Sequence, residues 1–332
     1  MRRREFLALL AGSTLSLPLT AWAQQSTKVY RMAILHPSHP VTEMSENSNL
    51  PYYRAFFDEL RRLGYIEGQN LIVERFSGEG RVDSYPEIAR KAAALSPDVA
   101  FAITASMAKP LKAVAPTIPI VAMTSDPVDA GLVSSLAKPG GNLTGVSVDP
   151  RLEIWGKRFQ LFGEIVPSMQ KVALLALRGN PERAAMLQAA EKARISVVEP
   201  SFVEGGSDAD YRAFFTASSK NGADALFVDG SPEHITKRRL ISELAAEFRL
   251  PAIYPFRSFV EAGGLMAYGV DLTELFRQAA RSIGKILTGA KPGDIPYYQP
   301  TKFELLINLK AAKELRLTVP PSMLSLADEL VE

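Results

Sequence analysis

Continuous apolar runs and amphipathic segments alternate along this chain from residue 29 onward. Short runs such as 99–103 are apolar throughout, which is typical of strands that are buried on both faces. Between these runs, segments such as 52–63 place apolar residues three and four positions apart, as one face of a helix requires. This pattern predicts the α/β class, with parallel sheets covered by helices on both faces.

The predicted elements fall into two successive blocks. In the first block, we predict strands at 31–35, 71–76, 99–103, 118–123 and 143–148, and helices at 52–63, 84–95 and 106–115. In the second block, we predict strands at 172–177, 195–198, 225–228, 252–254, 265–270 and 303–309, and helices at 154–165, 182–194, 208–220, 235–248 and 273–287. The chain of 332 residues is long enough for two domains, so we expect two α/β lobes.

The first 23 residues have the pattern of a secretory signal peptide. A basic start, Arg2-Arg3-Arg4, precedes a mostly apolar run at 7–19, and Ala21-Trp22-Ala23 predicts cleavage after Ala23. Residues 3–7 are similar to a twin-arginine export signal, and ordinary Sec export is the alternative. We therefore expect a soluble protein of the bacterial periplasm.

Composition excludes several classes of chemistry. The chain has no cysteine, so it has no disulfide, no thiolate metal ligand and no cysteine nucleophile. Its formal charge of +2, from 38 basic and 36 acidic residues, gives no support for a nucleic-acid partner. No nucleophile elbow, phosphate-binding loop or zinc-protease motif occurs. His36 and His39 lie three residues apart, too few ligands for a metal site. We expect no catalytic residue, no metal and no cofactor, and hence no enzyme.

Polar and aromatic residues follow several of the predicted strands. Because ligands of open parallel sheets gather at the carboxyl ends of strands, these residues are candidates for binding a small polar ligand. Asp126 has two interpretations, since its carboxylate could hold a ligand ammonium group or cap its own turn. The candidate ligand-binding residues are His36, Thr104, Ala105, Ser106, Ser125, Asp126, Asn180, Asp229, Ser231, Tyr254 and Phe256.

Three segments resemble a known family. They are 57–70 (FDELRRLGYIEGQN), 126–145 (DPVDAGLVSSLAKPGGNLTG) and the tail at 320–329 with Pro320-Pro321-Ser322-Met323-Leu324. The chain is thereby identified as similar to the periplasmic substrate-binding proteins of ABC transporters, the family that includes tryptophan- and tyrosine-binding members.

The resemblance implies a type 1 periplasmic-binding-protein fold with two hinged, Rossmann-like lobes. The implied N-terminal lobe is 28–148 plus about 272–298, and the C-terminal lobe is 151–270 plus about 300–332. The implied function is capture of a small molecule, such as an amino acid or aromatic compound, between the lobes of a monomer. The implied partners are an inner-membrane permease and its ATPase.

Two alternatives from other classes stay open at this point. An extracytoplasmic sensor that passes a ligand signal to a membrane receptor could use the same two lobes. A two-lobed enzyme would need a base and a partnered nucleophile between the lobes, and the sequence offers no persuasive pair.

Overall fold

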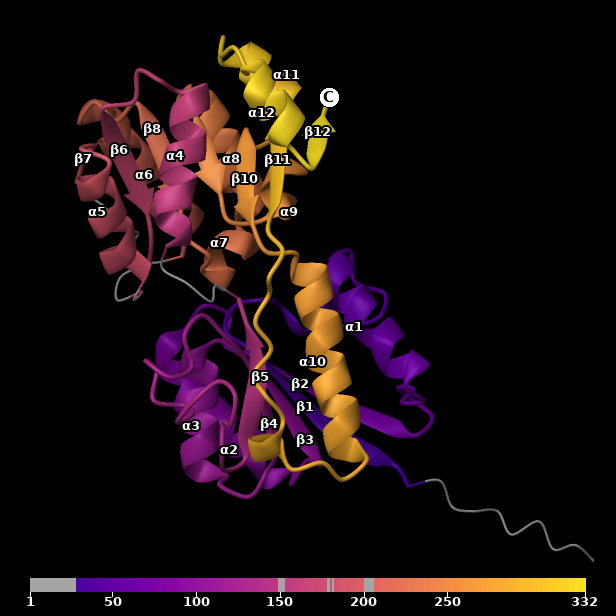
Figure 1. Cartoon of the computed structure of the whole chain (residues 1–332). Helices are drawn as coiled ribbons and strands as arrows, with labels where there is room; N and C mark the ends of the chain where they lie inside the picture. The colour runs from indigo at the N-terminus through magenta and orange to yellow at the C-terminus, as the bar shows by residue number, and fades with distance from the viewer. Residues whose placement is uncertain (1–27, 149–152, 178–179, 181, 200–205) are drawn as a thin grey trace, which may run out of the picture.

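The computed structural model describes residues 28–148, 153–177, 180, 182–199 and 206–332. Two lobes, each with a central sheet, are stacked along the long axis of the molecule (Figure 1). The predicted signal peptide lies outside the described residues. Within the described ranges, no helix combines the length and the apolar character that crossing a membrane would require.

The N-terminal lobe is built on a five-stranded parallel sheet of order β2-β1-β3-β4-β5. The strands are β1 (Tyr30–His36), β2 (Leu71–Ser77), β3 (Val99–Ile103), β4 (Ile120–Thr124) and β5 (Leu143–Ser147). Helices α1 (Pro51–Arg62) and α10 (Leu272–Leu287) pack on one face, and α2 (Tyr85–Ala94) and α3 (Ala105–Val114) pack on the other. Strands β3 and β4 are buried throughout because both faces are covered, as their apolar runs predicted.

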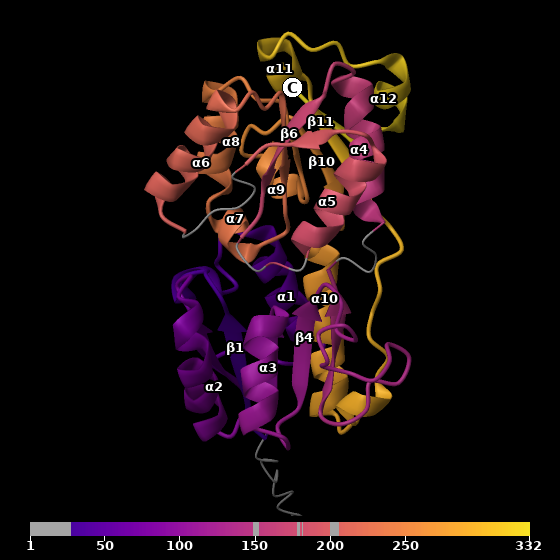
Figure 2. The same ribbon diagram turned by 90° about the vertical axis from the view of Figure 1, so that its left-hand side faces the viewer.

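The C-terminal lobe has a seven-stranded sheet of order β12-β11-β10-β9-β8-β6-β7. The strands are β6 (Lys171–Leu175), β7 (Ser196–Val197), β8 (Ala225–Val228), β9 (Ala252–Tyr254), β10 (Met266–Gly269), β11 (Glu304–Asn308) and β12 (Glu329–Val331). One face carries α4 (Ile154–Ile165), α5 (Glu182–Lys192), α11 (Leu309–Glu314) and α12 (Pro321–Leu326). The other carries α6 (Asp208–Lys220), α7 (Pro232–Thr236), α8 (Arg238–Glu247) and α9 (Arg257–Val260) (Figure 2).

The α/β class and the two lobes are confirmed, and three details differ from the sequence prediction. Strand β11 pairs with β10 in the antiparallel sense, although parallel sheets were predicted. The predicted helix 235–248 is two helices that meet at Lys237. The edge strand β12 was not predicted, since its residues are mostly exposed and show no apolar run. The chain between β10 and β11 passes through the other lobe, where α10 packs, so it makes no βαβ crossover on this sheet and β11 can enter in the antiparallel sense.

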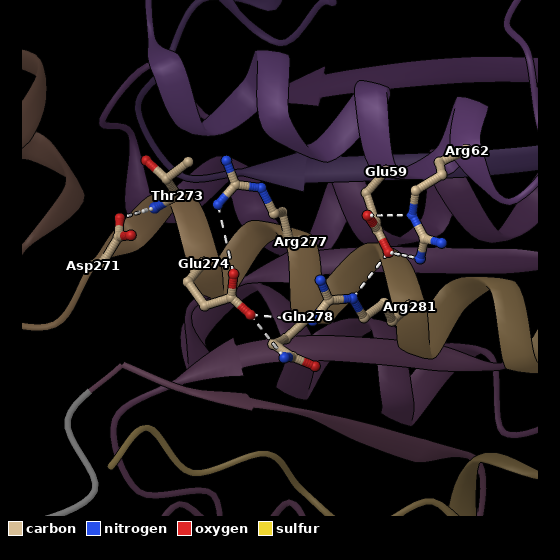
Figure 3. Close-up of polar contacts among 8 residues, drawn as sticks. All are labelled: Glu59, Arg62, Asp271, Thr273, Glu274, Arg277, Gln278 and Arg281. Carbon is tan, nitrogen blue, oxygen red and sulfur yellow. Dashed lines mark hydrogen bonds and ion pairs between the residues drawn. The ribbon is translucent and has the colours of Figure 1, made fainter. Parts of the chain in front are cut away.

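Helix α10 follows β10 in the chain, yet it packs against α1 in the N-terminal lobe (Figure 3). A polar network joins the two helices: Arg281 Nε donates to Glu59 Oε1 at 2.9 Å, and Arg62 donates to both oxygens of Glu59. At the start of α10, the Asp271 carboxylate accepts from the Thr273 N–H at 2.7 Å and caps the helix. The helix is therefore fixed to the first lobe by apolar packing and by this network.

After α10, the chain runs beside β5 before it returns to the second sheet. The Tyr298 N–H donates to the Gly145 carbonyl at 2.9 Å, and the Ser147 N–H donates to the Tyr298 carbonyl at 2.8 Å. The Tyr297 hydroxyl donates to the Ala122 carbonyl at 2.8 Å. Residues 295–298, which we call the strap, therefore lie along the β5 edge of the first sheet and are hydrogen-bonded to it.

The pKa of Glu59 leads to a prediction about acid stability. Hydrogen bonding to Arg62, and then to Arg281, lowers the pKa of this buried carboxyl to about 2. Because the folded-state pKa lies below the unfolded value, the stabilisation is present above about pH 4.5 and is lost as pH falls toward 2. We expect Glu59→Gln to lower the free energy of unfolding by about 1–2 kcal/mol at pH 7. This deficit should shrink as pH falls.

Urea unfolding of wild type and Glu59→Gln at pH 7 and at pH 3 measures this. Asp58→Asn is the matched control, because Asp58 is an exposed neighbour on the same helix whose pairing with Arg61 is screened by water. A Glu59→Gln deficit that grows on acidification would contradict the assignment.

Candidate ligand-binding site

The two lobes contact each other through polar side chains at the carboxyl ends of their strands. Ser125, directly after β4, donates from its hydroxyl to Glu182 Oε1 across the border at 3.1 Å. At a second point, Ser38 Oγ and Thr236 Oγ1 lie 3.2 Å apart, with Thr236 in helix α7 at the border (Figure 2). Ligands of open α/β sheets bind at strand ends of this kind. The border between the lobes is therefore the candidate site.

Asp229 organises the C-terminal-lobe side of this border. Its buried Oδ2 accepts from Asn180 Nδ2 at 2.5 Å and from the Leu177 N–H at 3.3 Å, and its Oδ1 accepts from the Ser231 N–H at 2.8 Å. Leu177 and Asn180 follow β6, whereas Asp229 and Ser231 follow β8, and the strand order reverses between these two strands. One carboxylate thus ties together the loops on both sides of the switch point, where ligands bind in open sheets.

Glu182 is the first residue of α5, and its carboxyl group is also buried. Burial, and then the charge of Asp229, raise the pKa of Glu182 to about 7, although the nearby Arg158 guanidinium acts in the opposite direction. Burial likewise raises the pKa of Asp229 to about 6, against the effect of its hydrogen-bond donors. Two buried acids with raised pKa values favour a proton or another positive charge at this point of the border.

Gly230 lies between an aromatic ring and the Glu182 carboxyl group. A Cβ placed on Gly230 would lie 3.5 Å from Phe256 Cζ and 3.7 Å from Glu182 Oε1. Tyr254 lies elsewhere, fully buried in the lobe, where its ring stacks on Phe259 at 4.9 Å between centroids. Of the two aromatic candidates, Phe256 is therefore the one beside the acid, and the site we propose does not use Tyr254.

Behind Asp229, two side chains form a buried chain of polar contacts. The Tyr211 hydroxyl lies 2.7 Å from His234 Nδ1, and His234 Nε2 lies 3.3 Å from Asp229 Oδ1. Burial lowers the pKa of His234 to about 3, so the ring is neutral at pH 7. With the tyrosine hydroxyl donating to Nδ1, we assign the ring proton to Nε2, where it faces Asp229. Among the described residues His234 Nε2 nevertheless has no hydrogen-bond partner, so the ring packs behind Asp229 without fixing its carboxylate.

His36 and His39 flank Ser38, the N-terminal-lobe partner of the second interlobe contact. Their rings are stacked, with centroids 3.9 Å apart, and His36 Nδ1 accepts from the Ser38 and His39 N–H groups. Burial lowers the pKa of both imidazoles, and the Arg238 guanidinium of the other lobe acts further on His39. Within the part of the chain that the structure describes, no three His, Cys, Asp or Glu side chains are grouped as metal binding would require.

The remaining candidates of the first lobe follow β3 and β4. Thr104 has a φ of +78°, an unfavourable value for a β-branched residue, and its hydroxyl lies 2.7 Å from that of Ser106. Ala105 begins α3. Asp126 is exposed, and its Oδ1 accepts from the Val128 and Asp129 N–H groups, so the structure shows its turn-capping contacts. A role of Asp126 toward a ligand stays a prediction.

Sequence reasoning missed Glu182 and Arg158. Arg158 is buried in α4, its Nε donates to the Tyr268 carbonyl at 2.9 Å, and its guanidinium lies 4.3 Å from the Trp155 ring centroid. A usable signal was present for Arg158, since it stands on the apolar face of the predicted helix 154–165. Glu182 gave no such signal, because an acidic residue in the first turn of a helix is ordinary.

Comparisons with known proteins agree with this architecture. A family model described as "ABC transporter substrate binding protein" matches residues 41–331. A tyrosine-binding protein of Clostridioides difficile (strain R20291) is 26% identical over 267 residues, which are 79% of this chain and 75% of that protein.

Solved structures show the same fold. A conserved domain protein of Vibrio cholerae has a TM-score of 0.80 at 25% identity, over 91% of this chain and 100% of that one. A streptococcal ABC domain in complex with L-Trp has a TM-score of 0.78 at 23% identity, over 92% and 100% of the two chains. A ligand-free, open substrate-binding protein of Clostridium difficile has a TM-score of 0.61 at 22% identity, over 91% and 99%. These similarities confirm the predicted type 1 periplasmic-binding-protein architecture.

Proposed function

Because this chain belongs to the family of ABC transporter substrate-binding proteins, we propose that it captures a small molecule between its lobes and delivers it to a membrane permease. The permease and its ATPase would be the partners, and the binding protein would act as a monomer. The two lobes would move as the units 28–148 plus about 272–298 and 151–270 plus about 300–332. The leader at residues 1–23 would direct export to the periplasm by the Sec or twin-arginine route.

One observation carries this proposal: polar groups at strand ends of both lobes meet in a buried border. Ser125 of the first lobe reaches Glu182 of the second at 3.1 Å, and Glu182 lies close enough to Asp229 for the charge of Asp229 to raise its pKa. A ligand placed here would touch both lobes at once, so it would favour the closed arrangement through its differential affinity. The open, ligand-free form of a similar protein supports opening of this fold as the complementary state.

We propose an amino acid with an aromatic side chain as the ligand. A relative named for tyrosine and a similar structure with L-Trp support this class. The site offers acidic groups for an ammonium group, the exposed Thr104–Ser106 hydroxyl pair for a carboxylate, and Phe256 for an apolar portion. Each recognises one part of such a molecule.

A thermal-shift screen of the purified protein against amino acids, small aromatic acids and sugars tests the proposal. A compound that binds the folded state at 100 times its dissociation constant adds about 2.7 kcal/mol to stability, which raises the melting temperature measurably. We expect aromatic amino acids to give the largest rise. A rise given only by sugars, or by no compound, would contradict the proposed ligand class.

A further inference from the structure

Glu182 and Asp229, two buried acids of the border, differ in how their charges are met. Asp229 receives three hydrogen bonds from its own lobe, so its carboxylate is held whether or not the lobes meet. Glu182 receives the Gly230 N–H from its own lobe and the Ser125 hydroxyl from the other lobe. Its surroundings are therefore completed by closure of the two lobes.

Closure also places Glu182 in an unfavourable electrostatic position. Glu182 is only 8% exposed, and the charge of Asp229 acts on its carboxyl group, while Arg158 of α4 is the opposing cation. His234 is neutral, and Glu233 of α7, also raised in pKa by burial, lies further along the same border. Two carboxylates thus face one guanidinium, and when both are ionised one negative charge is uncompensated among these groups.

We propose that Glu182 is the charge that must be neutralised before the lobes can close, and that the ligand neutralises it with a protonated amine. This inference rests on the proposed function, whose site it deepens. A primary ammonium group carries one positive charge and three donors, and it fits beside a carboxylate that already accepts from a hydroxyl and an amide. A neutral sugar hydroxyl would leave the charge in place. A hard metal ion would need more oxygen ligands than this group supplies.

The inference predicts how the ligand-free protein responds to pH. The pKa of Glu182 is raised to about 7 in the closed form, whereas in an open form its carboxyl group would be solvated and have an ordinary pKa near 4.5. Closing therefore takes up a proton between these two values, so the closed fraction rises as pH falls through about 7. In Glu182→Gln this charge is absent, so the closed fraction at pH 8 should exceed that of wild type, and the pH response that remains is that of other border groups such as Glu233 and His39.

Small-angle X-ray scattering of the ligand-free protein from pH 8 to pH 5 measures the closed fraction through the radius of gyration. We expect the wild-type radius to exceed that of Glu182→Gln at pH 8, and this difference to shrink on acidification because Glu182 then becomes protonated. Glu191→Gln, which makes the same change at an exposed glutamate of the same helix α5, is the matched control and should behave as wild type. The same pH response in wild type and Glu182→Gln would overturn the role of Glu182.

Calorimetry with matched probes tests the amine. L-tyrosine and L-tryptophan are compared at pH 8 with 3-(4-hydroxyphenyl)propanoate and indole-3-propanoate, which lack only the amine. We expect the amino acids to bind wild type at least 30-fold more tightly than their partners. Glu182→Gln should remove most of this preference, and Glu191→Gln should change it by less than threefold.

Equal affinity for both members of each pair, or loss of the preference in Glu191→Gln and not in Glu182→Gln, would overturn the inference. If none of the four probes binds, the proposed aromatic amino-acid ligand fails instead. The scattering experiment, which uses no ligand, then still decides whether Glu182 controls closure.

Discussion

Gly145→Ala is expected to abolish folding of the N-terminal lobe. Gly145 lies in β5, where a Cβ would be 1.8 Å from the Ala122 carbonyl oxygen of the neighbouring strand and 2.7 Å from the Tyr297 ring and hydroxyl. The carbonyl belongs to the backbone of a buried strand, and the ring belongs to the strap that leads the chain back to the second lobe. Neither can move without breaking sheet hydrogen bonds, so we expect a loss of at least about 4 kcal/mol.

Expression yield and urea unfolding of the purified protein measure this effect. Gly156→Ala is the matched control, because a Cβ there meets no atom within 4 Å and the residue lies in helix α4. Alanine in that helix should raise stability by about 0.5–1 kcal/mol. A folded Gly145→Ala protein with near wild-type stability would show that the strap does not lie against β5 in this way.

Asp229→Ala is expected to abolish ligand binding while changing stability much less. Alanine leaves the Ser231 and Leu177 N–H groups and the Asn180 amide without their acceptor, at about 1–3 kcal/mol for each group that stays buried. The same change removes a carboxylate whose burial is unfavourable, since burial raises its pKa to about 6. These two effects oppose each other in the free energy of unfolding.

In ligand binding there is no such compensation, because without Asp229 the loops after β6 and β8 are no longer hydrogen-bonded to a common carboxylate. We expect at least a 100-fold loss of affinity, about 2.7 kcal/mol, for the compound that gives the largest rise in the thermal-shift screen. Calorimetric titration measures it, with Asp58→Ala as the control on the exposed face of α1. An affinity within threefold of wild type would mean that Asp229 has no part in organising the site.

Local patterns predicted most of the fold. The apolar runs at 99–103 and 225–228 are strands β3 and β8, and the periodic segment 52–63 is helix α1 with a difference of one residue at each end. These elements are predictable because a strand buried on two faces, or a helix buried on one face, requires apolar residues at nearby positions in the chain. The break at Lys237 and the antiparallel entry of β11 were not predictable in this way, since both depend on where distant parts of the chain lie.

The site was predictable only in part. The rule that ligands bind at the carboxyl ends of parallel strands predicted several residues that the structure brings to the border around Glu182. They are Ser125, Asn180, Asp229, Ser231 and Phe256. It also found Tyr254, because a residue at a strand end can point into the lobe as well as toward a ligand, and no local pattern distinguishes the two directions. Asp126 is a strand-end carboxylate of the same type, and its contacts in the structure are those of the turn cap.

The sequence by itself determined the alternation of strands and helices, the two lobes and the family resemblance, because each is carried by residues close together in the chain. Only the tertiary structure decided the electrostatics of the site. Glu182 is an ordinary acidic residue at a helix start until folding buries it against Ser125, 57 positions away, and near Asp229 and Arg158. Burial and charge proximity act through space, and they turn this acid into the group on which we propose closure depends.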